Sequence, residues 1–205
     1  MMSLRKLAPV VLSAFCFFAT AQPEAARADT LSLDLDPAHS TVEFTLGATL
    51  HTVKGTFAFK QGTIRFDPAT GQASGTVVVD LASGQSGDAK RDANMRNNVL
   101  QVQTYPLAVF TPSRVQVQLA NGKPSALDVD GVLAIHGGSH AMTLHVTLEG
   151  NGASMTAHAQ FSVPYVQWGM RDPSTFFLHV GNTVAIDVTA AGQVHGLGAN
   201  ASALP

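Results

Sequence analysis

Apolar and polar residues alternate with a period of two along most of the chain between residues 41 and 188. This alternation is typical of antiparallel strands that turn one face to a core and the other to water. Residue pairs common in tight turns, such as Asn121-Gly122 and Gly137-Gly138, separate the alternating runs. The pattern predicts about eight strands joined by hairpins, at residues 41–46, 52–59, 77–81, 107–119, 127–135, 142–148, 155–163 and 184–188.

An all-β chain with about eight antiparallel strands predicts a sandwich or a closed barrel, and a barrel of this size is either filled by side chains or holds one small ligand. Many residues on the predicted inner faces are small, including Gly55, Gly131 and Ala157. They would leave a narrow apolar channel, and tapered packing in a solid core is the alternative. We expect the interior to be lined by Phe44, Phe57, Val79, Val117, Leu133, Leu144 and Ala159.

Residues 88–110, with the sequence DAKRDANMRNNVLQVQTYPLAVF, interrupt the alternation. Asp92 stands four residues before Arg96, and the apolar spacing around them predicts a short helix at about 88–98. Because a closed sheet needs no helix for its stability, we expect this helix to lie near a barrel mouth as a plug or lid. Arg91 and Asp92 are candidates for contact with the head group of a ligand, and a solvated amphipathic cover is the alternative.

The connection between the last two predicted strands is rich in aromatic residues, with Tyr165, Trp168 and Phe176-Phe177. Several large rings exposed together usually mark a binding surface. We therefore expect Trp168, the only tryptophan, to rim the pocket opening and touch a ligand or a membrane. The alternative is a loop packed across the barrel end as a stopper.

The N-terminus is typical of a secretory signal peptide. Arg5 and Lys6 precede an apolar run, at residues 7–21, that is too short to span a bilayer as a mature helix. Small-x-small cleavage signals end at Ala21 and Ala28, and we favour cleavage after Ala28, where the chain turns polar. These features predict a periplasmic protein with a signal peptide at 1–28, a barrel domain at 29–193 and a flexible tail at 194–205.

Cysteine content and charge narrow the function classes. Cys16, the only cysteine, lies inside the predicted signal peptide, so the mature chain would have no disulfide and no thiolate chemistry. Losing that peptide removes three basic residues and one acidic residue, which changes the formal net charge from −2 to −4. Such mild acidity gives no reason to expect nucleic acid as a partner. The chain has no Gly-x-Ser-x-Gly, His-Glu-x-x-His or phosphate-loop motif, so we expect no enzyme activity.

Three polar residues on neighbouring predicted strands have the chemistry of zinc ligands. If Gly137-Gly138 is a two-residue turn and residues 150–153 form the next loop, Asp130, His145 and His158 lie in one row. By the alternation, all three side chains lie on the outward face of the predicted sheet. We therefore favour a solvated polar ladder and predict no metal site.

Five segments stand in order along the chain, namely LDPAHSTVEFTLG, VKGTFAFKQGTIRFDP, RDANMRN, TYPLAVF and VDGVLAIHGGSHAMTLHV. Together they resemble the YceI family of periplasmic proteins, over about Leu35 to Val188. The resemblance implies an extended lipocalin-like antiparallel barrel that holds a polyisoprenoid chain, such as an isoprenoid quinone or a prenyl lipid. It implies no catalysis and no cofactor besides this ligand.

The resulting prediction is a non-catalytic periplasmic protein that carries an isoprenoid lipid in an apolar barrel channel. Two alternatives are a structural or partner-docking barrel with a filled core and a metal-dependent enzyme that uses the histidine row. The sequence leaves open which lipid is carried, what its head group is, between which partners it moves, whether the protein transiently contacts a membrane surface and whether it forms a homodimer.

Overall fold

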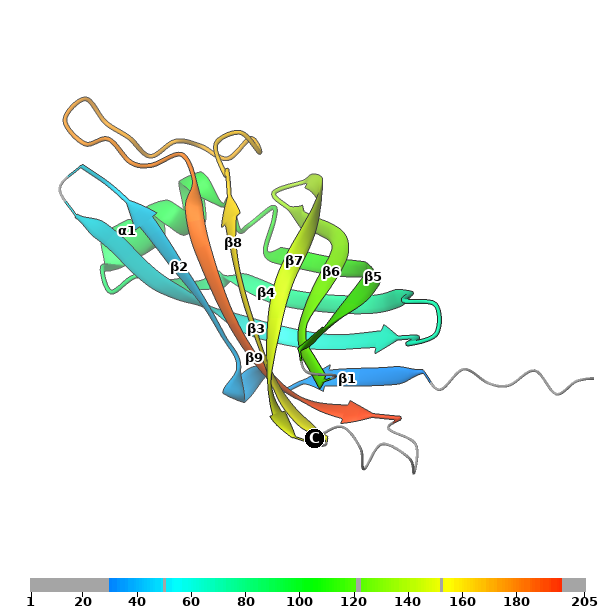
Figure 1. Ribbon diagram of the computed structural model, residues 1–205. Helices are drawn as coiled ribbons and strands as arrows, with labels where there is room; N and C mark the ends of the chain where they lie inside the picture. The colour runs from blue at the N-terminus through cyan, green and yellow to red at the C-terminus, as the bar shows by residue number, and fades with distance from the viewer. Residues whose placement is uncertain (1–29, 50, 121–122, 152, 197–205) are drawn as a thin grey trace, which may run out of the picture.

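The computed structural model describes residues 30–49, 51–120, 123–151 and 153–196, which form a closed antiparallel barrel (Figure 1). The barrel strands are β2 (Thr41–Gly47), β3 (Thr52–Phe66), β4 (Ala73–Gln85), β5 (Leu107–Ala120), β6 (Lys123–Ile135), β7 (Gly138–Asn151), β8 (Ser154–Val163) and β9 (Val184–His195). Their order around the barrel is β3-β2-β9-β8-β7-β6-β5-β4, and the β3–β4 pairing closes the ring. The predicted lipocalin-like all-β barrel with one short helix is confirmed.

The predicted barrel domain, residues 29–193, begins and ends close to the first and last described residues. The predicted signal peptide and residues 197–205 fall outside them. Strand β9 continues to His195, two residues past the predicted end of the barrel domain at 193, because its last residues pair with another strand.

That partner is β1 (Leu31–Leu35), a strand missing from the predicted set although its three leucines alternate with Ser32 and Asp34. Strand β2 pairs with the first part of β3 on one side and the first part of β9 on the other. Strand β1 pairs with the same two strands beyond β2, at Thr63–Phe66 of β3 and Gly192–His195 of β9. The short 3₁₀ turn η1 (Pro37–His39) joins β1 to β2. Ser40 fixes this joint, since its hydroxyl donates to the Asp36 carbonyl at 2.6 Å.

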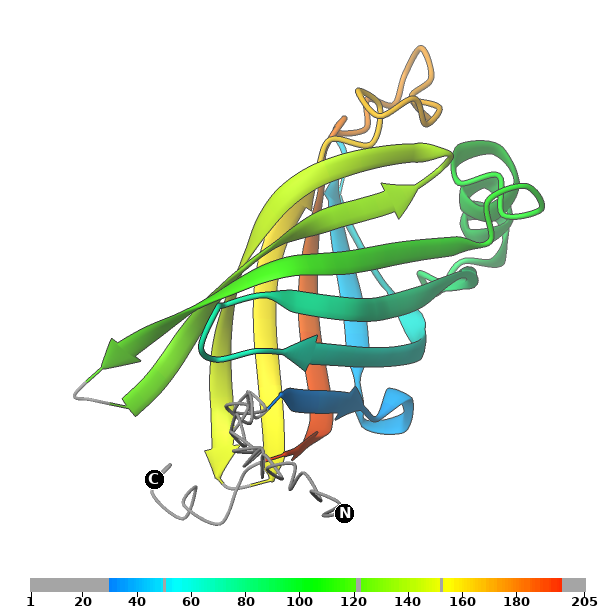
Figure 2. The ribbon, with the colours of Figure 1, turned by 90° about the vertical axis from the view of Figure 1, so that its right-hand side faces the viewer.

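Burial follows the predicted alternation along most strands. In β2, for example, Val42 and Phe44 are buried while Thr41 and Glu43 are exposed. The register between β3 and β4 shifts twice, next to Ala58 and again before Gln61, and such bulges bend a strand and help a sheet to close. The strands are long and curved (Figure 2), and apolar side chains from all of them line the interior.

The predicted helix is present. Helix α1 (Ala89–Asn94) begins after Asp88, whose side chain accepts hydrogen bonds from two amides of the first turn at 3.0 and 2.9 Å. It continues directly into a π-helical turn, η2 (Met95–Val99), whose Val99 is buried together with the following Leu100. These two apolar residues hold the segment against one end of the barrel. Within the described residues, no helix has the length and apolar character needed to cross a bilayer.

The hairpin between β6 and β7 differs in register from the prediction. Its turn lies at His136 and Gly137, whose φ angles of 50° and 76° are in the left-handed region that a type I′ turn requires. The predicted turn lies one residue later. His145 therefore pairs with Asp128 and not with Asp130.

The hairpin between β7 and β8 is also shifted, and His158 pairs with Thr147. The predicted row of Asp130, His145 and His158 is therefore wrong. Instead, His145 Nδ1 lies 2.5 Å from Asp128 Oδ1, and this contact is the main cause that lowers the pKa of Asp128. Among the described residues, no group of three or more His, Cys, Asp or Glu side chains is placed to hold a metal ion.

Candidate ligand cavity

A cavity of about 540 Å³ lies inside the barrel. Every strand from β1 to β9 contributes apolar side chains to its wall, including Leu33 from β1, Phe110 from β5 and Val184 from β9. Ligand pockets in proteins typically have volumes of about 300–1,000 Å³. The interior is therefore hollow enough for a ligand, and the alternative of a filled core does not describe it.

Most residues that the sequence predicts to face inward line this cavity. The structure brings together Phe44, Phe57, Val79, Leu133, Leu144 and Ala159, from six different strands. Phe44 and Ala159 keep only 5% and 7% of their surface exposed, so both are part of the wall itself. The two-residue period was enough to identify them because the face that a strand residue occupies depends only on its position along the strand.

Val117 is absent from the cavity wall and is 41% exposed. Strand β4 pairs with β5 only over Leu107–Phe110, so the β5–β6 hairpin extends beyond the closed part of the barrel. Figure 2 shows this hairpin projecting past its neighbours. Val117 lies on this projecting part, where β5 has no pairing with β4.

The ring of Phe44 is placed by a glycine on the adjacent strand. A Cβ atom at Gly55 would lie only 2.4 Å from Phe44 Cζ and 2.1 Å from the Gln85 carbonyl oxygen, so a larger residue is excluded there. The Phe44 ring lies over this bare backbone and contacts Phe57 at a centroid distance of 5.2 Å. Small inward residues therefore position the larger ones, in addition to widening the channel.

Polar lining groups gather at one end of the barrel, which we call the loop end. It consists of the ends of β2 and β3 around Ala48 and His51, the helical segment α1–η2, and the connection at residues 171–183 (Figure 1). Ser86, Arg91 and Asn94 line the cavity at this end. His51 and Asn94 are also exposed, so the cavity reaches the surface here.

Arg91 is held in place by two hydrogen bonds to Ser86. Its Nε donates to the Ser86 hydroxyl and its Nη2 donates to the Ser86 carbonyl, both at 2.7 Å. Within the described part of the chain, Nη1 has no protein acceptor. The guanidinium is therefore fixed beside the cavity with donors available for an anionic or carbonyl-bearing head group.

Asp92 does not line the cavity and is only 7% exposed. Its Oδ1 accepts hydrogen bonds from the Ser86 amide, at 2.8 Å, and from the Ser86 hydroxyl. Because Ser86 in turn binds Arg91, the carboxylate positions the guanidinium through the serine. Of the two predicted head-group residues, the structure thus places Arg91 at the cavity and Asp92 behind it.

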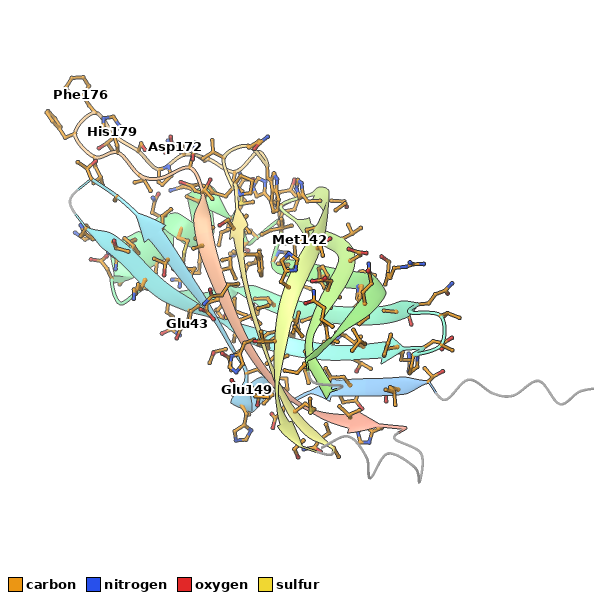
Figure 3. The ribbon with its side chains drawn as sticks, in the orientation of Figure 1. Glu43, Met142, Glu149, Asp172, Phe176 and His179 are labelled. Carbon is orange, nitrogen blue, oxygen red and sulfur yellow. The ribbon has the colours of Figure 1, made fainter. Side chains whose placement is uncertain are left out.

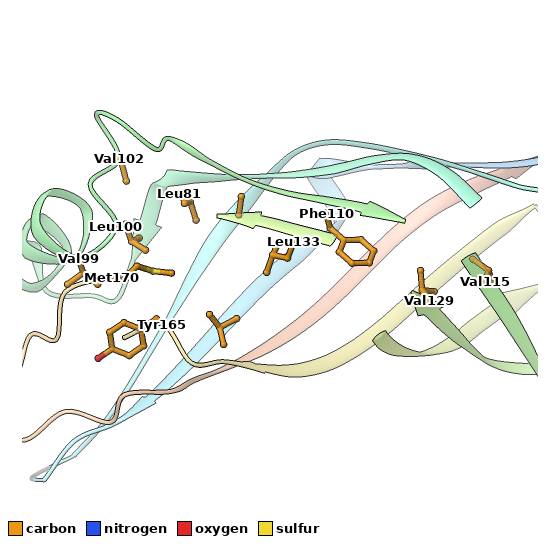
Figure 4. Packing of buried hydrophobic residues seen from close by; sticks show 12 residues of the cluster. Leu81, Val99, Leu100, Val102, Phe110, Val115, Val129, Leu133, Tyr165 and Met170 are labelled. Atoms are coloured by element: carbon orange, nitrogen blue, oxygen red, sulfur yellow. The ribbon is translucent and has the colours of Figure 1, made fainter. Parts of the chain in front are cut away.

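The long connection after β8 supplies lining residues that no sequence period indicated. Tyr165 and Met170 are 5% and 3% exposed and pack beside Val99 and Leu100 at the loop end (Figure 4). The Tyr165 hydroxyl donates to the Gly181 carbonyl at 2.8 Å. Burial raises the pKa of Tyr165 to about 12, and the nearby Asp172 carboxylate adds to the shift. The phenol therefore stays protonated and fastens the two halves of this connection.

Trp168 does not line the cavity. It is half-buried, and its indole stacks on the His140 ring with centroids 3.8 Å apart and planes within 6°. The residue sits on a turn in which the Trp168 amide donates to the Pro164 carbonyl at 3.1 Å. The structure thus places Tyr165 and Met170 of this segment at the cavity and Trp168 against the end of the β6–β7 hairpin.

The family model of the YceI-like domain matches residues 33–191. This range contains every barrel strand and the cavity described above, apart from the last residues of β9. No curated protein matches the chain.

Solved structures share the fold. BcnA of Burkholderia cenocepacia superposes with a TM-score of 0.62 and 24% identity, covering 77% of this chain and 99% of that protein. A polyisoprenoid-binding domain from Saccharophagus degradans, implicated in plant cell wall breakdown, has a TM-score of 0.58 and 19% identity, with coverages of 78% and 97%. The YceI protein of Campylobacter jejuni has a TM-score of 0.57 and 17% identity, with coverages of 71% and 86%.

Proposed function

This chain belongs to the YceI family, and we propose that it is a non-catalytic, periplasmic lipid-binding protein that holds a polyisoprenoid chain, such as that of an isoprenoid quinone, inside its barrel. The observation that carries the proposal is the distribution of polarity along the cavity. Apolar side chains from every strand line its length, and Ser86, Arg91 and Asn94 line it at the loop end. A molecule with a long apolar chain and one polar head group matches this distribution.

Burial of the chain alone does not account for specific binding. Moving a methylene group out of water contributes about 0.8 kcal/mol. A prenyl lipid in a bilayer is already in an apolar environment, so the cavity gains little over the membrane from the chain itself. Shape and head-group contacts must supply the preference. In this protein the fixed Arg91 guanidinium is the group best placed to supply it.

Two further considerations support the proposal. The similar domain from Saccharophagus degradans is described as polyisoprenoid-binding. The N-terminal residues have the order of a basic start, an apolar run and small-residue cleavage signals, which is expected of a chain exported to the periplasm. Exchange of the ligand with a membrane then requires only transient contact, since the lipid is soluble in the bilayer and in the cavity.

The test is lipid extraction from protein purified without detergent, followed by mass spectrometry. We expect an isoprenoid lipid in a fixed molar ratio to the protein, because a cavity inside the barrel should retain one ligand through purification. A mixture of phospholipids in variable amounts, or no lipid together with no binding of an added isoprenoid quinone, would contradict the proposal. The export step is tested separately, by N-terminal sequencing of the protein from the periplasmic fraction, where we expect a start at Asp29.

A further inference from the structure

Two phenylalanines form the largest exposed apolar feature of the described chain. Phe176 and Phe177 each keep 87% of their surface exposed, and their rings contact each other edge to face with centroids 5.0 Å apart. The other large apolar side chains that are exposed in the described residues, Val117 and Val132, keep about half as much, at 41% and 40%. Figure 3 shows Phe176 at the tip of the connection, well clear of the barrel. Such exposure is costly in water and indicates a binding role.

The tip is a built turn that holds both rings outward. The Thr175 amide donates to the Leu178 carbonyl at 2.8 Å, and the Leu178 amide donates back to the Thr175 hydroxyl at 3.3 Å. Below the tip, the Thr49 amide donates to the His179 carbonyl at 2.9 Å, which ties the connection to the end of β2. The two rings are thus presented on a supported projection that would need no reordering to bind.

The same turn is continuous with the candidate cavity. Pro173 and Leu178, which flank the turn, line the cavity, while Phe176 and Phe177 point away from it. The cavity also reaches the surface at this end, beside His51. A surface that receives the two rings therefore lies next to the opening through which a ligand would pass.

Charge around the tip does not favour a strongly charged partner. Arg171 and Asp172 are adjacent and both exposed, so their charges offset each other, and the chain carries a formal net charge of −2. A protein partner of usual affinity requires an interface of about 1,600 Å², whereas this narrow tip offers two rings. Aromatic side chains of this kind bury readily at the boundary between lipid head groups and acyl chains.

We propose that Phe176 and Phe177 insert into the surface of a phospholipid bilayer and dock the loop end of the barrel on the membrane that supplies its ligand. The inference rests on the proposed function for the identity of the cargo, but the docking itself depends only on the two rings. Binding should be largely independent of anionic lipid and of salt, because insertion of apolar rings drives it.

The test is flotation of the protein with vesicles of pure phosphatidylcholine. Wild-type protein should float with the vesicles. The double substitution Phe176→Ser/Phe177→Ser should weaken partitioning by about tenfold per ring, and so about a hundredfold in total. Phe176→Leu/Phe177→Leu should retain most of the binding, because it keeps the tip apolar. Val132→Ser, an exposed apolar residue on the barrel wall, is the matched control and should bind like wild type.

Two results would overturn the inference, namely wild-type protein that does not float, or a serine variant that floats as well as wild type. Binding of a short-chain isoprenoid quinone, added in solution without vesicles, separates this outcome from failure of the proposed function. Quinone binding without flotation would contradict membrane docking and support the proposed isoprenoid ligand. Flotation that depends on the two rings, without quinone binding, would support membrane docking and contradict the proposed isoprenoid ligand.

Discussion

The two ends of the barrel close the same cavity by different means. At the end opposite the loop end, which we call the strand end, β1 lies between β3 and β9 and its Leu33 and Leu35 line the cavity. At the loop end, closure comes from the helical segment and the long connection, and polar groups line the cavity beside apolar ones. The strand end is therefore closed by a strand of the sheet. The loop end is closed by segments outside the sheet, namely the helical segment and the long connection, which together we call the cover.

The strand end packs leucines against bare backbone. A Cβ atom at Gly62 would lie 2.4 Å from Leu35 Cδ1, and one at Gly192 would lie 2.9 Å from Leu33 Cδ1. Both glycines belong to the strands that flank β1, so each leucine occupies space that a side chain on the neighbouring strand would otherwise take. Hydrogen bonds to strands on both sides leave β1 little freedom to move.

The difference indicates how a ligand would be oriented and exchanged. Segments outside the sheet have fewer backbone hydrogen bonds to hold them and open more readily than strands paired on both sides. A lipid should therefore enter and leave at the loop end, with the end of its apolar chain against Leu33 and Leu35 and its head group near Arg91.

The largest effect should follow from obstructing the channel between the two ends. Ala159 is buried on β8 between Val146 and Val188, in the middle of the wall. Ala159→Trp should place an indole across the channel and weaken isoprenoid binding by more than about a hundredfold, which is about 2.8 kcal/mol. Since the ring can occupy the cavity, unfolding should become easier by less than about 2 kcal/mol. Titration with an isoprenoid quinone and chemical denaturation measure the two quantities.

Ser162→Trp is the matched control, because Ser162 is exposed on the same strand. It should leave both quantities nearly unchanged. If Ala159→Trp unfolds the barrel instead, the interior tolerates no added volume, and the channel that joins the two ends is not available to a ligand.

The next effect compares two leucines, one at each end. Leu35 and Leu178 are both half-buried, and both line the cavity. Leu35→Ala should lower the free energy of unfolding by about 2 kcal/mol, because the paired strands around it cannot collapse into the space left. Leu178→Ala should lower it by about 1 kcal/mol or less, since its turn can relax. Equal losses in denaturation experiments would mean that the two ends are equally rigid.

Removing the polar group at the loop end should have a smaller effect, on ligand affinity. Arg91→Gln should weaken binding of a lipid with a carbonyl or anionic head group by about tenfold, since one charge-assisted hydrogen bond is lost. Lys90→Gln is the control, because Lys90 carries the same charge on the same helix, is exposed, and does not line the cavity. If both variants bind equally well, the loop end does not recognise the head group.

The strand faces could be predicted from the sequence, but the strand registers could not. Alternation assigns each residue to a face, and burial on one face makes that assignment reliable, as Phe44 and Leu133 show. The β6–β7 register was wrong by two residues, a shift that leaves every side chain on its predicted face. Nothing in the alternation detects such a shift. The positive φ at His136 is unusual for a residue other than glycine, which is why the glycine pair was the more attractive turn.

The loop end was predicted less well than the wall because its segments have no simple period. The helix and Arg91 were found because a helix interrupts a run of strands. The inward positions of Tyr165, Met170 and Leu178 depend on how the connection folds back over the barrel, which composition does not show. The aromatic content did single out the segment, although the exposed rings belong to Phe176 and Phe177 and the sole tryptophan stacks on a histidine.

The smallest effect at neutral pH concerns the bond that fastens the cover. The pKa of Tyr165 is raised to about 12 in the folded protein, whereas a tyrosine in the unfolded chain titrates near its usual value of about 10. Below about pH 10 both states hold the proton, and its contribution to stability is fully present. Between about pH 10 and 12 the unfolded state loses the proton first, so stability falls by at most about 1.4 kcal/mol per pH unit. Tyr165→Phe should remove this part of the alkaline slope.

At neutral pH the same substitution should cost about 1 kcal/mol, the usual contribution of one hydrogen bond, here the bond to the Gly181 carbonyl. Denaturation of both proteins across this pH range measures the slope and the neutral difference together. Tyr105→Phe is the control, since Tyr105 is the other tyrosine and is less buried. Because the Tyr165 bond spans the cover, the variant should also release a bound isoprenoid faster, by a few-fold. An unchanged release rate, with the expected loss of stability, would show that the cover opens elsewhere, at the helical segment.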